Sequence, residues 1–291
     1  MNVHMDFLSD WQNIIIEEIK EAGLSYSPAT STDSLIIKYF TYQRKKGGSS
    51  RPRRVHMSNR FSYPPELENG LKRLIDMLKK GEDISPYFSK QVDKISSIDG
   101  LFNDWGVLHL HLGDGIDPAN GRYVTRTGPL LFLYLHAEDA YLINVYEHGD
   151  WTDRSVLQTA FDNWPELIEP YVLKGAIGLS PPYTEDDHAR LRAAGLNVAM
   201  ELKDNEGNTF VIAPPGFGQT ASRDAFADVR AYHQSINTIR AIERDLLEKP
   251  QSFETLFGGN KPESVRLKLI RDNDKFYIIE QSTNTRLYEL T

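Results

Sequence analysis

Cysteine is absent from this chain of 291 residues. Its absence excludes a disulfide framework, a thiolate zinc site and a cysteine nucleophile. The sequence also lacks any run approaching the roughly 20 apolar residues that a membrane span requires. Its first residues do not combine the basic start and the apolar stretch of a signal peptide. We therefore expect a cytoplasmic protein with no membrane partner.

Basic residues are in the minority, because 33 Lys and Arg oppose 41 Asp and Glu, for a formal net charge of −8. This balance argues against a protein that coats nucleic acid non-specifically, since such binding depends on neutralising phosphates. One segment departs from the average, because Lys38 to Arg60 contains basic residues and no acidic one. The segment is either a solvated linker or an arm that binds phosphate groups or a partner.

Apolar side chains recur with helical spacing in some segments and alternate in others, which indicates an α+β protein. The helical segments are 7–22, 34–46, 64–83, 155–167, 184–195 and 223–248. The strand-like segments are 53–58, 107–112, 130–136, 141–148, a hairpin around 204–208, and a meander of 264–270, 275–281 and 285–290. We expect a helical arm over 1–50, a central domain over 51–168 and a C-terminal α+β domain over 169–291. In the central domain, helices pack on one face of a small, mainly antiparallel sheet.

Two histidines stand two residues apart in the strand-like stretch DWGVLHLHLG. Strand side chains alternate between faces, so Leu108 and Leu110 share one face while His109 and His111 share the other. The same alternation in the next two strands adds further polar residues to the histidine face, namely Tyr134, His136, Asn144, Tyr146 and His148. The pattern predicts one apolar face and one solvent-accessible polar face.

The clustered histidines indicate proton-transfer chemistry. Histidine changes charge near neutral pH, so a pair suits a reaction in which one group removes a proton and another supplies it. His-x-His with a third histidine is also typical of zinc and iron sites in β-structure, and His109, His111 and His148 form such a set. No carboxylate falls convincingly on their face, which favours acid–base chemistry without a metal or other cofactor.

The stretches PPELENGLKRLIDMLKKGED, DWGVLHLHLG and TGPLLFLYLHAEDAYLINVYEHGDW occur in an order that resembles the RelE/HigB class of bacterial toxin endoribonucleases. The resemblance covers about Arg51 to Trp151 and lies in element order, not in a signature string. It implies a RelE-like sheet that cleaves mRNA, often within the ribosome, and a protein antitoxin or inhibitor as partner. The chain departs from the class in its length, its acidic charge and its histidines in place of arginine. In its histidine chemistry it is more similar to the self-contained ribonucleases of the barnase, EndoU and colicin superfold.

We therefore expect a metal-independent endoribonuclease of a toxin–antitoxin or phage-defence system, with RNA as its substrate. His109 or His111 would share the base and acid roles with His148, and a cation such as Arg122 or Arg126 would stabilise the phosphate. The candidate catalytic residues are His109, His111, His148, Tyr146 and Arg126. The candidate substrate-binding residues are Arg51, Arg53, Arg54, Arg122, Tyr134, His136 and Asn144. Two alternatives stay open: a metal-dependent enzyme with histidine ligands, and a non-catalytic component that binds a partner.

Overall fold

The computed structural model describes residues 2–46, 50–147, 152–181, 183–194, 196, 198–214, 216, 218–248 and 263–290. The contacts divide the chain into two compact units. Unit 1 combines Met1–Phe40 with Val229–Thr291, and unit 2 is Thr41–Asp228. These boundaries differ from those expected at residues 50 and 168, because strand pairing joins the two ends of the chain in unit 1.

Unit 1 is built on a four-stranded sheet in the order β1-β8-β9-β10. Its strands are β1 (Asn2–His4), β8 (Ser264–Asp272), β9 (Lys275–Glu280) and β10 (Thr285–Leu290). The last three form the antiparallel meander that the alternation predicts, and β1 adds to it in parallel, with Asn2 opposite Ser264. No pattern in the sequence predicted β1, because a strand of three residues is too short to show alternation.

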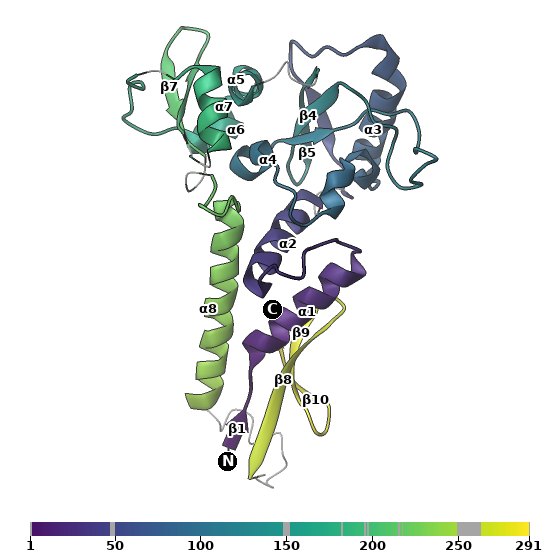
Figure 1. Cartoon of the computed structure of the whole chain (residues 1–291), viewed down its shortest axis with the longest axis vertical. Coiled ribbons are helices and arrows are strands. Elements are labelled where there is room, and N and C mark those ends of the chain that lie inside the picture. The colour runs from purple at the N-terminus through teal and green to yellow at the C-terminus, as the bar shows by residue number, and fades with distance from the viewer. Residues whose placement is uncertain are drawn as a thin grey trace. The chain divides into compact units, whose positions relative to one another are not determined.

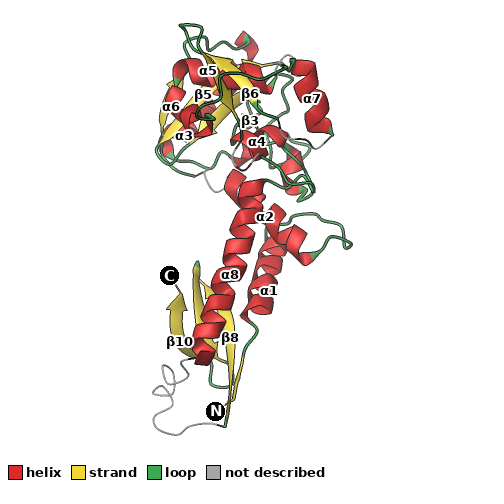
Figure 2. Cartoon of the chain, turned by 90° about the vertical axis from the view of Figure 1, so that its left-hand side faces the viewer, coloured by secondary structure: helices red, strands yellow, loops and turns green. Residues whose placement is uncertain are grey.

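The helical part of unit 1 consists of α1 (Phe7–Glu21), of α2 (Thr32–Lys46) as far as Phe40 and of α8 (Phe226–Glu248) from Val229 (Figures 1 and 2). The last residues of α2, from Thr41 onward, belong to unit 2. Asp6 begins α1 as its N-cap, since its carboxylate accepts a hydrogen bond from the backbone N–H of Ser9. Trp11 of α1 stacks on Tyr232 of α8, with ring centroids 6.0 Å apart. The buried residues of α1, namely Phe7, Trp11, Ile15 and Ile19, follow the apolar spacing that predicted this helix.

Unit 2 contains a four-stranded sheet in the order β2-β5-β4-β3. Its strands are β2 (Arg54–Met57), β3 (Leu108–Leu110), β4 (Leu130–Leu135) and β5 (Asp139–Tyr146). β2 runs parallel to β5 and the other pairs are antiparallel. The other elements of unit 2 are η1 (Pro65–Leu67), α3 (Glu68–Lys80), η2 (Ser85–Tyr87), η3 (Lys90–Asp93), α4 (Gly100–Trp105), α5 (Asp153–Asn163), α6 (Pro165–Ile168), η4 (Glu169–Tyr171), α7 (Glu185–Ala193), β6 (Met200–Lys203) and β7 (Thr209–Ile212). The expected α+β class is confirmed.

Both faces of this sheet are buried. The leucine face packs on α3, and its core includes Leu71, Leu74, Leu108, Leu110, Leu131 and Leu133. The opposite face packs on α5, α6, β6 and β7, and its core includes Phe132, Tyr134, Ile143, Val156, Leu157 and Leu202. The expectation that helices cover only one face is wrong, because α5, α6 and the β6–β7 pair form a second layer.

A β-bulge shifts the register between β4 and β5. Phe132 pairs with Asn144, whereas the next residue, Leu133, pairs with Leu142, so Ile143 is skipped. Ile143 consequently joins the core on the histidine face instead of the leucine face. Strict alternation along β5 would place Ile143 on the face opposite Asn144 and Tyr146, and the extra residue of the bulge reverses that placement.

The described residues include no helix that is both long enough and apolar enough to cross a membrane.

Candidate functional site

The predicted polar face of the unit 2 sheet is largely covered in its middle. His109 on β3 pairs with Phe132 on β4, and both side chains turn to the face that α5 and α6 cover. Tyr134, predicted to bind substrate, is only 4% exposed, and burial raises the pKa of its phenol well above the ordinary value. The expected solvent-accessible position of Tyr134 is therefore wrong, and its contact with substrate stays a prediction.

His111 does not share an accessible face with His109. Strand β3 ends at Leu110, and the backbone N–H of His111 donates to the carbonyl of Tyr87 instead of continuing the sheet. The imidazole is 5% exposed, and its Nδ1 lies 3.2 Å from both the amide nitrogen and the carbonyl oxygen of Thr127. The expected His-x-His pair is wrong in its geometry, because the strand is shorter than the apolar alternation.

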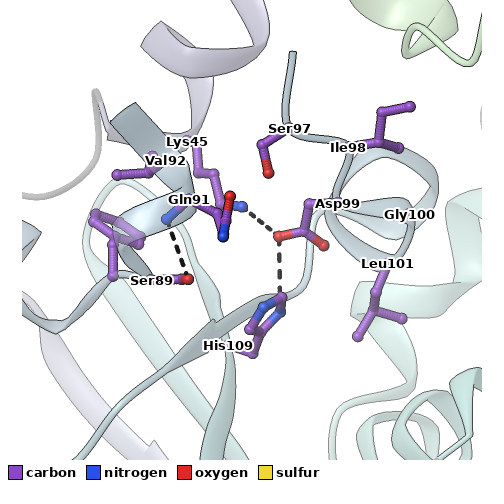
Figure 3. Close-up of a pocket in the computed structure, with 11 residues that line it drawn as sticks. Lys45, Ser89, Gln91, Val92, Ser97, Ile98, Asp99, Gly100, Leu101 and His109 are labelled. Atoms are coloured by element: carbon purple, nitrogen blue, oxygen red, sulfur yellow. Dashed lines mark hydrogen bonds and ion pairs between the residues drawn. The ribbon is translucent and has the colours of Figure 1, made fainter. Parts of the chain in front are cut away.

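His109 lies beside a carboxylate and an ammonium group that come from two other elements. Asp99 is the N-cap of α4, where its Oδ1 accepts from the backbone N–H of Phe102 at 3.1 Å. The Oδ2 of Asp99 is 3.7 Å from the Nδ1 of His109 and accepts a hydrogen bond from the Nζ of Lys45. Figure 3 shows the carboxylate between the two basic side chains.

The Asp99 carboxylate is buried yet held in its charged form. Burial by itself raises the pKa of Asp99, but the charges of His109 and Lys45 and the hydrogen bonds from Lys45 and Phe102 outweigh it, so the pKa lies below its ordinary value. The side chains of Lys45 and Asp99 are 16% and 11% exposed. An ion pair in such surroundings is only weakly screened by solvent.

A pocket of about 370 Å³ opens beside this group, and we call it the His109 pocket. Its lining consists of Lys45, Phe88, Ser89, Gln91, Val92, Ser97, Ile98, Asp99, Gly100, Leu101 and His109. Hydroxyl and amide groups therefore stand beside one acid, one imidazole and one ammonium (Figure 3). The arrangement can transfer a proton through His109 and neutralise a negative charge through Lys45.

Tyr146 and Arg126, two further candidate catalytic residues, do not line this pocket. The hydroxyl of Tyr146 is 3.2 Å from the Oγ1 of Thr159 on α5, and its ring packs against Phe132. Arg126 is exposed on the loop before β4. His148 lies outside the described residues, so its predicted role stays a prediction.

The candidate substrate-binding residues are dispersed, and several have structural partners. Asn144 accepts a hydrogen bond from the backbone N–H of Ser62, and Arg122 is paired with Asp93 at 3.3 Å. Arg53 is 5% exposed and donates to the carbonyls of His136 and Arg51. Burial, followed by the charge of Arg51, lowers the pKa of Arg53. The guanidinium is enclosed by protein and occupied by backbone carbonyls, so its contact with phosphate stays a prediction that this arrangement does not support.

A second polar group occupies the β2 end of the same sheet face, and we call it the His56 cluster. Its members are Arg54, His56, His136, Asp139, Tyr141 and Trp164. The Nε2 of His56 lies 2.8 Å from the Oδ1 of Asp139, which also accepts from the Nε of Arg54 at 2.9 Å. His136 is exposed, as predicted, and its ring contacts Tyr141 at a centroid distance of 5.6 Å.

Sequence reasoning missed the partners in both groups. Asp99 stands in the stretch SSIDGLF, where an acid at a helix start is the usual signal of an N-cap. Lys45 belonged to the basic segment, and no pattern linked it to His109. His56 and Tyr141 share a face only because β2 pairs with β5 in register, with His56 opposite Tyr141.

Among the described residues, no group of three or more His, Cys, Asp or Glu side chains is arranged to hold a metal ion. The predicted metal set of His109, His111 and His148 therefore has no support from the two members that the structure describes. His109 and His111 do not converge, because His111 is enclosed beside Thr127.

Comparisons of the chain with protein-family models, with curated proteins and with solved structures found no match.

Proposed function

We propose that the chain is an endoribonuclease and that the His109 pocket is its proton-transfer site. The observation that carries the proposal is the placement of His109 beside the buried Asp99 carboxylate and the Lys45 ammonium at an open pocket. A base beside a carboxylate, with a cation nearby, is an arrangement that acid–base cleavage of a phosphodiester can use. RNA is the proposed substrate because of the resemblance to toxin endoribonucleases and the basic segment from Lys38 to Arg60.

Cleavage would proceed by attack of the neighbouring 2′-oxygen on phosphorus. His109 takes the proton of the 2′-hydroxyl, and the Asp99 carboxylate stabilises the imidazolium that forms. Lys45 neutralises the charge that develops on the phosphate oxygens. The bond from phosphorus to the 5′-oxygen then breaks, and His148, assigned from the sequence alone, gives the leaving oxygen its proton. The products carry a 2′,3′-cyclic phosphate and a 5′-hydroxyl.

The test is RNA cleavage by the purified full chain, in buffer with a metal chelator and, separately, with translating ribosomes. Wild-type protein should release products with cyclic phosphate ends. His109→Ala should cleave about 10²–10⁴ times more slowly, since that is the usual contribution of a positioned proton-transfer group. The matched control is His233→Ala, which removes an exposed histidine from α8 in unit 1 and should leave the rate unchanged.

A different result would favour the alternative of a non-catalytic, partner-binding component. The Asp99 carboxylate caps α4 and pairs with Lys45, so the same group also has a structural role. In that result, wild-type protein leaves RNA intact under both conditions while His109→Ala lowers the melting temperature. The group of His109, Asp99 and Lys45 would then have only a structural role, which is to hold α2, α4 and β3 together. The toxin–antitoxin or phage-defence setting, and an antitoxin partner, stay predictions drawn from the resemblance.

A further inference from the structure

The imidazole of His56 is held in a fixed plane at the surface of unit 2. Its Nε2 edge is bound to Asp139 at 2.8 Å, and one ring face lies on Tyr141 with centroids 5.0 Å apart and planes inclined by 19°. The side chain is nevertheless 41% exposed. Tyr141 and Asp139 take up one face and one edge of the ring, and the face turned away from Tyr141 is the one on which we build the proposal below.

Asp139 fixes the orientation of His56 and is itself fixed. It accepts two hydrogen bonds from the guanidinium of Arg54, at 2.9 Å from Nε and 2.8 Å from Nη2. These bonds, followed by the bond to His56, hold the pKa of Asp139 below its ordinary value. The carboxylate is therefore charged at neutral pH and keeps the imidazole in place without covering its outer face.

Tyr141 is supported from its sides. His136 meets it at a centroid distance of 5.6 Å and an interplanar angle of 76°, and Trp164 meets it at 5.1 Å and 63°. Both contacts are close to perpendicular, so neither ring takes the place of His56 in the parallel stack. Together the rings of His56, Tyr141, His136 and Trp164 form a platform, and the imidazole of His56 is its outermost ring.

Basic residues flank this platform along the chain. Arg51 and Arg60 are exposed on either side of β2, whereas Arg54 is neutralised by Asp139. Exposed rings combined with nearby cations are the usual means by which proteins bind single-stranded nucleic acid, because every base offers a π-face and every nucleotide a phosphate. A duplex is a poorer ligand for such a platform, since its bases are already stacked on one another.

We propose that the His56 cluster binds single-stranded RNA by stacking one unpaired base on the outer face of His56. Arg51 and Arg60 contact the phosphates on either side of that base. The choice of RNA rests on the proposed function, and the platform is distinct from the His109 pocket. The platform would restrict the substrates of the enzyme to RNA with unpaired bases.

The experiment measures binding of the full chain to a fluorescent 2′-O-methyl oligoribonucleotide, which cannot be cleaved because it has no free 2′-hydroxyl. His56→Gln keeps a hydrogen-bond donor for Asp139 but removes the ring, and it should weaken binding about five- to hundredfold, the loss of one base–ring stack. His56→Phe keeps a ring without the hydrogen bond and should bind within a few-fold of wild type. His233→Ala is again the matched control, and melting temperatures verify that every variant is folded.

This experiment tests the RNA-binding platform and the proposed endoribonuclease function separately. Wild-type binding with loss in His56→Gln, in a chain that does not cleave RNA, supports the platform and overturns the proposed function. Equal binding by wild type and a folded His56→Gln overturns the platform whether or not RNA is cleaved. Equal binding of the single strand and of a duplex of the same sequence also overturns it, because phosphate contacts alone would then account for the affinity.

Discussion

The His109 pocket and the His56 cluster lie at opposite edges of one sheet and use the same kinds of side chain. Each pairs a strand histidine with an aspartate that also binds a basic residue. They differ in burial, since the Lys45 side chain is 16% exposed and that of Arg54 is 71% exposed. Charges in the first group act through protein and those in the second through water. This difference in burial is the basis on which we propose proton transfer for the first group and RNA binding for the second.

The largest expected difference between the two groups is in the cleavage kinetics of two alanine variants. His109→Ala should lower kcat for RNA cleavage by about 10²–10⁴, because it removes a proton-transfer group. His56→Ala should leave kcat nearly unchanged and raise KM about five- to hundredfold, because it removes a base-stacking ring. Steady-state rates over a wide range of RNA concentration separate the two. A fall in kcat for His56→Ala would mean that the two groups act as one site.

The next effect is on stability. Asp99→Ala should lower the free energy of unfolding by about 3–5 kcal/mol, since it leaves the buried Lys45 ammonium without its carboxylate partner and removes the cap of α4. Asp139→Ala should cost far less, because solvent screens the charges of Arg54 and His56. Urea denaturation of both variants measures the difference. Equal losses would show that burial does not distinguish the two aspartates.

The dependence of stability on pH sharpens the same contrast. The pKa of Asp99 is lower in the folded chain than in the unfolded one, so its carboxylate contributes stability that is complete above the unfolded value near pH 4. That contribution disappears as the pH falls through the folded pKa. Wild type should therefore lose melting temperature between about pH 5 and pH 2 more steeply than Asp99→Asn. Parallel curves for the two proteins would contradict the assignment.

The smallest effect concerns the arginines of the basic segment. Arg51→Gln should flatten the dependence of oligonucleotide binding on salt by about 0.7 in the slope of log K against log salt, the value for one phosphate contact on a single strand. Arg53→Gln should leave that slope unchanged and lower stability, because Arg53 is buried and donates to backbone carbonyls. Titrations at several salt concentrations distinguish them. If Arg53→Gln changes the slope as Arg51→Gln does, the segment contacts RNA as a whole.

The secondary structure was largely predictable because it depends on local patterns. The alternation around Leu131 and Leu133 predicted β4, and the spacing of Leu71, Leu74 and Leu78 predicted α3. The site was less predictable. His109 was identified from its strand, but its partners Asp99 and Lys45 come from elements far away in the sequence. No spacing rule connects such residues.

The sequence by itself determined the α+β class, the leucine face of the sheet and the candidacy of His109, because residue periodicity and side-chain chemistry are properties of short segments. Only the tertiary structure decided that the histidine face is covered in its middle, that His111 and Arg53 are enclosed, and that His56 lies on Tyr141. These outcomes depend on where β3 ends, on the bulge at Ile143 and on the parallel pairing of β2 with β5. Each is a long-range balance of packing and hydrogen bonding, which local sequence patterns do not encode.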